Sequence, residues 1–140
     1  MSITIQRASW PAHKEQLYLI RRKVFIEEQQ VPEEIEIDEW DEKSIHVLAL
    51  EGQQPVGCGR LLPDGHIGRM AVLPSHRGQG IGAKLLQTLI DLAQQSDMKE
   101  VILSSQVHAI DFYLKAGFTP YGDVYQEAGI PHRAMKRNLQ

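Results

Sequence analysis

A glycine-rich stretch between a strand-like and a helix-like segment constrains the fold of this chain more than any other feature. Residues 78–82 read Gly-Gln-Gly-Ile-Gly. Glycine at alternate positions permits backbone angles that side chains forbid, and it lets successive N–H groups face one point. A helix that begins there adds the positive end of its dipole. The stretch therefore predicts one of two features, a cradle for a phosphate or a tight turn between a strand and a helix.

Two known phosphate-binding loops can be compared with this stretch. A Walker A loop needs Gly-Lys followed by Ser or Thr, which the sequence GAK at 82–84 does not provide. The spacing GxGxxA at 78–83 formally fits a Rossmann fingerprint, but that fold needs an acid at the end of the next strand. The next strand-like segment ends SSQ at 104–106 instead. Both comparisons therefore argue against a nucleotide-binding fold. It stays open as an alternative, which binding of NAD or ATP would identify.

Hydrophobic periodicity places the loop inside an alternating series of strands and helices. After the loop, apolar residues recur at the spacing of a buried helix face, namely Ile81, Leu85, Leu86, Leu89, Ile90 and Ala93. The other predicted elements are strands over 3–7, 45–50, 56–62, 67–73, 101–105, 118–126 and 130–136, and helices from Pro11 to about Gln30 and over 109–116. That order predicts one α/β (α+β) domain over residues 1–140, with a mixed central β-sheet flanked by helices.

Composition narrows the class of protein. A chain of 140 residues, with 42% hydrophobic and 24% charged residues, is typical of one soluble globular domain. The single cysteine, Cys58, allows neither an intrachain disulfide nor a cysteine metal cage, and no pair of histidines has metal-ligand spacing, so we expect no metal. Because no signal peptide or membrane span is found, we expect a cytoplasmic protein without a membrane partner. A net charge of −3 argues against a nucleic-acid partner.

Charge is distributed unevenly along the chain. Residues 27–42 contain nine Asp or Glu and no Lys or Arg, so the remainder carries 15 bases against 9 acids. One interpretation is a solvated loop. The other is an acidic side for a cationic substrate, opposite a basic side for an anionic cofactor.

Two motifs resemble one enzyme superfamily. Val72-x-Pro-x-x-Arg77-Gly78-x-Gly80-x-Gly82 resembles the acetyl-CoA loop of the GNAT acetyltransferases, whose core is Arg/Gln-x-x-Gly-x-Gly/Ala. A second signature of that superfamily is matched by FYLKAGF at 112–118. The stretches at 22–32, 36–38 and 129–132 resemble the small bacterial ElaA/YjcF-like branch. The resemblance covers essentially the whole chain and implies the GNAT fold, with a sheet that is splayed at the acetyl-CoA site.

The resemblance also implies where the cofactor lies. In GNAT proteins the backbone amides of the loop bind the pyrophosphate of CoA, which here corresponds to Arg77, Gly78, Gln79, Gly80, Ile81 and Gly82. The strand before the loop lies beside the pantetheine arm, which places Met70, Ala71 and Val72 there. Phe112 and Tyr113 belong to the second signature and are expected at the cofactor as well. The guanidinium of Arg77 is expected to add charge and hydrogen-bond donors for phosphate.

The resemblance implies direct attack of an amine on the thioester, without an acyl-enzyme. Tyr113 matches the tyrosine that protonates the leaving thiolate in many GNAT enzymes, although it could instead be a packing residue. The usual glutamate base aligns with His66, or two residues further with Gly68, which has no side chain. His132 and Glu28 are the remaining candidates for the base. No nucleophilic cysteine is needed, so Cys58 is expected to be buried and inert.

The implied function is therefore that of an acetyl-CoA-dependent N-acetyltransferase whose acceptor is a primary amine. In the GNAT fold the region after the first helices borders the acceptor cleft, so the resemblance implies an acidic rim of Glu28, Glu34, Glu36 and Asp38. The acceptor is therefore expected to be cationic, such as a polyamine, an aminoglycoside or a lysine-like amine. The rival function is an acyl-CoA-binding regulatory module that keeps the cofactor site and lacks turnover. The expected partners are acetyl-CoA and a small amine. Strand sharing at the C-terminal end would also allow a homodimer.

Overall fold

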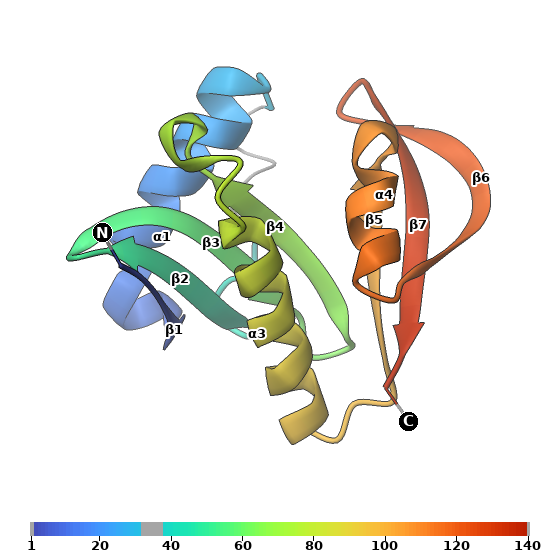
Figure 1. Ribbon diagram of the computed structural model, residues 1–140, viewed down its shortest axis with the longest axis horizontal. Coiled ribbons are helices and arrows are strands. Elements are labelled where there is room, and N and C mark those ends of the chain that lie inside the picture. The colour runs from blue at the N-terminus through green and yellow to red at the C-terminus, as the bar shows by residue number, and fades with distance from the viewer. Residues whose placement is uncertain (1, 32–37, 140) are drawn as a thin grey trace.

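One mixed sheet of seven strands organises the part of the chain that the computed structural model describes, residues 2–31 and 38–139 (Figure 1). The strand order is β1-β2-β3-β4-β5-β7-β6. The strands are β1 (Ile3–Ala8), β2 (Ile45–Glu51), β3 (Gln54–Leu61), β4 (His66–Val72), β5 (Glu100–Gln106), β6 (Thr119–Glu127) and β7 (Ile130–Asn138). The helices are α1 (Trp10–Arg21), α3 (Ile81–Gln95) and α4 (Ile110–Lys115), with the π-helix η1 (Arg22–Glu28) and the 3-10 turns η2 (Pro74–His76) and η3 (Val107–Ala109).

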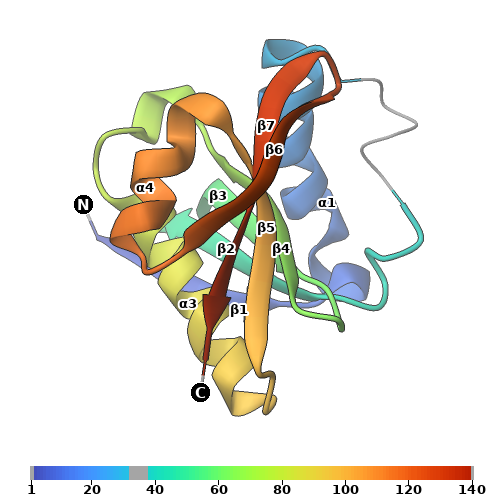
Figure 2. The ribbon, with the colours of Figure 1, turned by 90° about the vertical axis from the view of Figure 1, so that its right-hand side faces the viewer.

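Helices cover both faces of this sheet (Figure 2). The apolar residues predicted for the helix after the loop all lie buried on α3 and pack against the sheet, which confirms that expectation. On the opposite face, Leu17 and Ile20 of α1 pack with Leu48 of β2 and Cys58 of β3. Burial of these two apolar faces holds the strands between the helix layers. The fold confirms the expected mixed sheet with flanking helices.

The sheet opens between β4 and β5. These parallel strands pair at His66 with Ile102 and at Ile67 with Leu103, and no further pair joins them within the described residues. In Figure 1 the β5-β7-β6 group diverges from β4 as the strands rise. A β-bulge explains the divergence, since the β3–β4 register shifts between Cys58 and Arg60 and Arg69 has a φ of 49°. The bulge bends β4 away from β5 and creates the predicted splay.

The first helical region differs from the expected α-helix that runs from Pro11 to about Gln30. The α-helix ends at Arg21, and a wider π-helix continues to Glu28, where the N–H of Gln29 bonds to the carbonyl of Val24 at 3.0 Å. Regular α spacing predicts the burial of Leu17, Ile20 and Val24, which is observed. It does not reveal the wider winding, which changes the direction of the side chains that follow Val24.

Three further features considered from the sequence are the cysteine, a metal site and a membrane span. Cys58 is 1% exposed, so the expectation of a buried thiol is confirmed. Across residues 2–31 and 38–139, no three His, Cys, Asp or Glu side chains gather in a group that could hold a metal ion. The helices in those ranges lack the length and apolar character needed to cross a membrane.

Candidate active site

The loop between η2 and α3 has the backbone conformation that its glycines predict. Gly78 and Gly80 have φ angles of 79° and 80°, a region that L side chains rarely adopt. A Cβ added at either position would meet no atom within 4 Å, so both Cα atoms face open space. The first helical bond runs from the N–H of Lys84 to the carbonyl of Gly80, at 3.2 Å. The N–H groups before Lys84 therefore project from the helix end without a helical acceptor, as an anion site requires.

Side chains of the loop divide into two kinds. Ile81 is 2% exposed and belongs to the core, so only its backbone is available to a ligand. Gln79 is exposed. At Gly82, an added Cβ would lie 3.6 Å from Cζ of Phe112, so the Phe112 ring sits directly over this glycine. The contact joins α4 to the loop and brings the two sequence motifs together.

Arg77 is already engaged within the protein. Its Nε donates to the carbonyl of Val72 at 2.9 Å, and its two terminal nitrogens donate to the carboxylate of Glu28 at 2.8 and 2.6 Å. The hydrogen bond from Arg77 lowers the pKa of Glu28 below its ordinary value, and the same bond raises the pKa of Arg77. A carboxylate held in its ionised form is a weaker base. The structure therefore gives Glu28 the geometry of an anchor for Arg77.

One edge of β4 is open beside this loop. Ala71 pairs with Cys58 and Val72 with Gly57 on the β3 side. On the β5 side, the described residues supply no strand partner beyond Ile67. Backbone donors and acceptors along Met70, Ala71 and Val72 can thus hydrogen-bond to an extended ligand, as an edge strand does.

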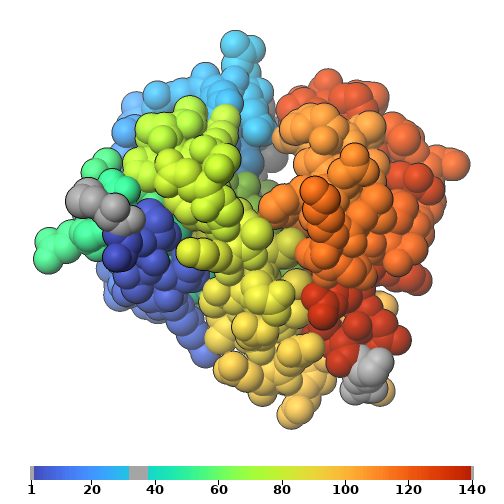
Figure 3. All heavy atoms as spheres, viewed as in Figure 1, coloured from blue at the N-terminus to red at the C-terminus, as the bar shows by residue number. Residues whose placement is uncertain are grey.

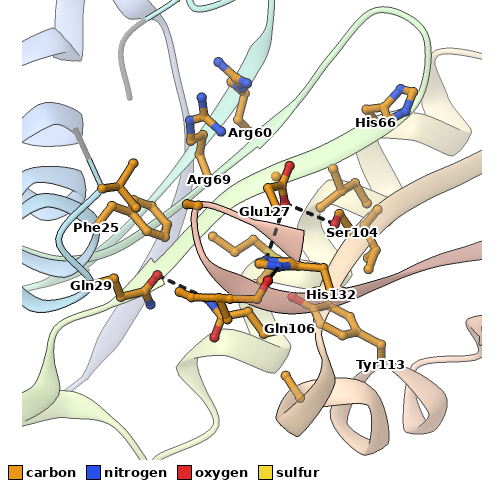
Figure 4. Close-up of a pocket in the computed structure, with 18 of the residues that line it drawn as sticks. Phe25, Gln29, Arg60, His66, Arg69, Ser104, Gln106, Tyr113, Glu127 and His132 are labelled. Carbon is orange, nitrogen blue, oxygen red and sulfur yellow. Dashed lines mark hydrogen bonds and ion pairs between the residues drawn. The ribbon is translucent and has the colours of Figure 1, made fainter. Parts of the chain in front are cut away.

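A cavity of about 480 Å³ fills the opening between β4 and β5. In Figure 3 a hollow lies between the loop region, in yellow-green, and α4, in orange. The lining comes from η1, β3, β4, β5, α4 and the β6–β7 hairpin, and it includes Phe25, Gln29, Arg60, His66, Arg69, Met70, Ser104, Gln106, Tyr113, Glu127 and His132 (Figure 4). Of the four sequence-predicted catalytic candidates, Tyr113, His66 and His132 line it and Glu28 does not.

Tyr113 enters the cavity from α4. Its ring packs edge-on against Phe112 and Phe118, with centroid distances of 5.0 and 6.0 Å. Removal of water around the phenol raises the pKa of Tyr113 above its ordinary value of 10.0. The hydroxyl is therefore protonated at neutral pH and able to donate a proton or a hydrogen bond. Ring packing and proton donation are compatible, because they use opposite ends of the side chain.

His132 lies on β7 with its ring held in one orientation. It is 7% exposed, it stacks on Tyr125 at 6.2 Å, and its Nδ1 lies 2.6 Å from the carbonyl of Ile130. Because a carbonyl can only accept, Nδ1 must carry the hydrogen. In the neutral ring Nε2 is then a lone-pair acceptor, 3.4 Å from a carboxylate oxygen of Glu127. This arrangement suits a base, since the proton that Nε2 takes up would meet an anion.

His66 lies elsewhere in the cavity, near the point where β4 and β5 still pair. Its Nδ1 bonds to the carboxylate of Asp64 at 2.8 Å, and its side chain is 51% exposed. Figure 4 shows His66 apart from the group formed by Glu127, Ser104 and His132. The structure thus places the two histidine candidates in different parts of the cavity.

Comparison with known proteins decides the family. A model described as the acetyltransferase (GNAT) domain matches residues 11–139, which is nearly the whole chain. This chain belongs to the GNAT acetyltransferase family. The family assignment confirms the resemblance carried by the loop and by the second motif, and it makes the protein an N-acetyltransferase.

Individual GNAT relatives support the same branch. The chain is 37% identical over 125 residues to the uncharacterized N-acetyltransferase YjcF of Bacillus subtilis, covering 86% of this chain and 89% of YjcF. The crystal structure of Escherichia coli ElaA matches with a TM-score of 0.86 and 31% identity, over 97% of this chain and 99% of ElaA. An acyl-CoA N-acyltransferase from Pseudomonas aeruginosa matches with a TM-score of 0.87 and 30% identity, over 97% and 99% of the two chains. These likenesses confirm the GNAT fold and the ElaA/YjcF-like branch.

The GNAT cavity also contains polar residues that the motifs do not single out. Ser104 of β5 and Glu127 of β6 are hydrogen-bonded to each other at 3.2 Å. Gln106 of β5 donates to the side chain of Gln29 at 3.1 Å and so bridges the opening to the end of η1. Alternation of side chains along β5 puts Ser104 and Gln106 on one face, but the strand predicted over 101–105 includes only Ser104 of the two. No local pattern points to Glu127 or Gln29.

Three carboxylates of the acidic stretch, Glu28, Asp38 and Asp41, form ion pairs with arginines outside that stretch. Asp38 bonds to Arg60 at 2.7 Å and to Arg69 at 3.3 Å. Asp41 bonds to the buried Arg21 at 2.7 Å and also to Arg60. Neither Asp38 nor Glu28 is therefore a free carboxylate, and the structure does not support the acidic-rim interpretation at these two residues. The predicted rim residues at 34 and 36 lie outside the described residues.

Proposed function

We propose that this enzyme transfers an acetyl group from acetyl-CoA to a primary amine by direct attack in a ternary complex. The observation that carries the proposal is that Tyr113 of α4 and His132 of β7 line one cavity, which opens beside the unpaired edge of β4. A proton donor and a proton acceptor are thus available where a thioester and an amine can meet.

Three features support acetyl-CoA as the donor. The amides at the start of α3, with the open space at Gly78 and Gly80, fit the pyrophosphate. The unpaired edge of β4 fits the extended pantetheine arm with its two amides. A backbone N–H of that edge would polarise the thioester carbonyl, as the donors of an oxyanion hole do. The chain's own contribution is to orient the donor and to direct its thioester into the cavity.

The proposed reaction balances through two side chains. Nε2 of His132 takes one proton from the ammonium, and the neutral nitrogen then forms the C–N bond to the acetyl carbon. The C–S bond breaks, and Tyr113 gives its phenolic proton to the leaving sulfur. The second proton lost by the nitrogen restores Tyr113, and His132 releases its proton to water. The net products are the acetylated amine, CoA with a free thiol, and one proton.

His132 is proposed as the base on geometric grounds. Its Nε2 faces the cavity with the tautomer set by the carbonyl of Ile130, and Glu127 lies 3.4 Å away. His66 is paired with Asp64 near the closed end of the opening. Glu28 is bound to Arg77 outside the cavity lining. His132 is thus the candidate whose surroundings best support proton transfer.

The experiment that tests this function measures both products. Purified protein is mixed with acetyl-CoA and a panel of spermidine, kanamycin and an N-blocked lysine amide, and CoA thiol and acetylated amine are quantified. Equal amounts of the two products are expected for at least one amine. If acetyl-CoA binds but no thiol is released with any amine, the protein is instead the acyl-CoA-binding module.

Two further properties belong to this proposal. We place the enzyme in the cytoplasm, where acetyl-CoA and CoA thiol are available and a reduced Cys58 is expected. A homodimer remains a prediction. The outermost strand β6 carries exposed apolar residues that a second copy could cover, namely Tyr121, Val124 and Tyr125. Light scattering of the purified protein measures the mass and decides between monomer and dimer.

A further inference from the structure

We infer that Glu127 binds the ammonium group of the acceptor amine, so that the carboxylate selecting a cationic acceptor comes from the β6–β7 hairpin. The inference rests on the proposed acetyl transfer in this cavity. In this inference the carboxylate that binds the acceptor lies inside the cavity lining and not in the acidic stretch, where Glu28 and Asp38 are bound to arginines.

The backbone fixes the place of Glu127. It is the last residue of β6 and pairs with Ile130, the first residue of β7. Between them, Ala128 and Gly129 have φ angles of 52° and 76°, the conformation of a tight two-residue hairpin turn. Such a turn sets the register of both strands. Glu127 and His132 therefore both line the cavity from neighbouring strands of one hairpin.

Hydrogen bonds fix the direction of the carboxylate. Ser104 donates to Oε2 of Glu127 at 3.2 Å, and Ser104 is itself hydrogen-bonded to the hydroxyl of Tyr125. The same Oε2 lies 3.4 Å from Nε2 of His132. Figure 4 shows the other carboxylate oxygen pointing away from Ser104 and His132. Glu127 thus keeps one oxygen for a partner that the described protein residues do not supply.

The charges around the cavity make Glu127 distinctive. It is the one carboxylate among the described lining residues, and no lysine or arginine is paired with it in those residues. The two lining arginines, Arg60 and Arg69, are instead bonded to Asp38. A carboxylate in a cavity wall without a cationic protein partner is stabilised by a cationic ligand.

The position of Glu127 also connects binding to reaction. An ammonium group that enters from the cavity could contact the carboxylate of Glu127 and approach Nε2 of His132, because Oε2 of that carboxylate lies 3.4 Å from Nε2. His132 could then remove a proton from the group that Glu127 has bound, and Glu127 would stabilise the imidazolium that forms. The acceptor class that this fits is a primary amine that is protonated at neutral pH, such as a polyamine or a lysine-like amine.

The test compares a cationic acceptor with a neutral one. Acetyl transfer is measured to spermidine, which is protonated at neutral pH, and to hydroxylamine, which is largely uncharged there. Glu127→Gln removes the charge and keeps the size and most hydrogen bonds. Glu127→Asp serves as the rescue variant, and Glu100→Gln, at the far end of β5 and outside the cavity lining, is the matched control. Binding of acetyl-CoA is followed in parallel by calorimetry.

The inference predicts a selective loss. In Glu127→Gln the KM for spermidine should rise about 3- to 10-fold, less than for a buried charged hydrogen bond, because the Glu127 side chain is 57% exposed and water screens its charge. The rate with hydroxylamine and the affinity for acetyl-CoA should stay within about two-fold, as in Glu100→Gln. Glu127→Asp should recover part of the spermidine KM.

Other outcomes overturn the inference. An unchanged spermidine KM makes Glu127 a solvated surface residue. Equal losses with spermidine and hydroxylamine show that Glu127 acts on the fold or on His132 alone. If the parent enzyme acetylates hydroxylamine but no cationic amine, this inference fails while the proposed transfer stands. If the parent transfers acetyl to no nucleophile, the proposed function fails and this inference with it.

Discussion

The carboxylate of Glu28 and the guanidinium of Arg77 form a two-point ion pair, with N–O distances of 2.8 and 2.6 Å. The pair joins the end of η1 to the residue that precedes Gly78. Arg77 also donates from Nε to the carbonyl of Val72, so its side chain connects η1, β4 and the loop. This geometry gives the arginine a role in holding the loop, in addition to any charge that it offers to phosphate.

Glu28→Gln should weaken acetyl-CoA binding through that contact. The change removes the charged partner of Arg77 and loosens the loop, so we expect the Kd of acetyl-CoA to rise a few-fold. Both side chains are about 40% exposed, so the unfolding free energy should fall by less than about 1 kcal/mol. Calorimetric titration measures the Kd. A lower Kd would mean that Glu28 competes with phosphate for the guanidinium, which would contradict the holding role.

Gly80→Val should abolish the thermal stabilisation that acetyl-CoA gives. The valine side chain would fill the open space at the loop and occupy a backbone angle of 80° that it disfavours. Gly52→Val is the matched control, because Gly52 also has a positive φ of 63° and open space, in the β2–β3 turn. It should lose stability and keep the shift in Tm with acetyl-CoA. An unchanged shift in Gly80→Val would reject the loop as the phosphate site.

Tyr113→Phe should lower kcat by about 10²- to 10⁴-fold, the usual contribution of general acid catalysis. The ring and its packing on Phe112 and Phe118 remain, so the Kd of acetyl-CoA should change little. Because burial raises the pKa of Tyr113, the parent rate should show no loss from deprotonation of this group until the pH exceeds 10.0. Steady-state rates across pH measure both effects. A near-normal kcat would make Tyr113 a packing residue.

Local patterns predicted the elements whose residues interact over short distances. The i, i+4 spacing of Ile81, Leu85 and Leu89 correctly predicted the buried face of α3, because that face depends on helix geometry alone. The left-handed angles at Gly78 and Gly80 follow in the same way from the chemistry of glycine. Both features could therefore be predicted before any tertiary contact was known.

Long-range pairs escaped prediction for an equally physical reason. Arg21 is 1% exposed because it forms an ion pair with Asp41. That partner lies 20 residues away in the sequence, so no helical pattern predicts the buried arginine. The contact between Ser104 and Glu127 depends on the registers of β5 with β7 and of β7 with β6. A register becomes known only when the sheet is assembled, so Glu127 could not be placed in the cavity from the sequence.

The buried ion-pair region should make stability fall in mild acid. His46 is 1% exposed, and loss of water around its ring lowers its pKa below the ordinary value of 6.5. The neutral ring donates from Nε2 to the carbonyl of Asp41 at 2.7 Å. Unfolding exposes the ring, which then takes up a proton below about pH 6.5, so protons favour the unfolded chain.

The unfolding free energy should therefore decrease as pH falls below about 6.5, with a slope from this residue of up to about 1.4 kcal/mol per pH unit. Urea denaturation from about pH 8 to about pH 5.5 measures that slope. His46→Gln keeps a hydrogen-bond donor but cannot be protonated, so its slope should be shallower. Equal slopes in the parent and the variant would exclude His46 as the source.

Direct attack in the opening between β4 and β5 is tested most directly by initial rates measured over a grid of acetyl-CoA and amine concentrations. In the proposed mechanism both substrates are bound together, because the one cysteine is buried and Tyr113 and His132 are proposed to transfer protons only. The account predicts double-reciprocal lines that intersect, as a ternary complex requires. Parallel lines, the mark of a ping-pong reaction through an acyl-enzyme, would contradict it.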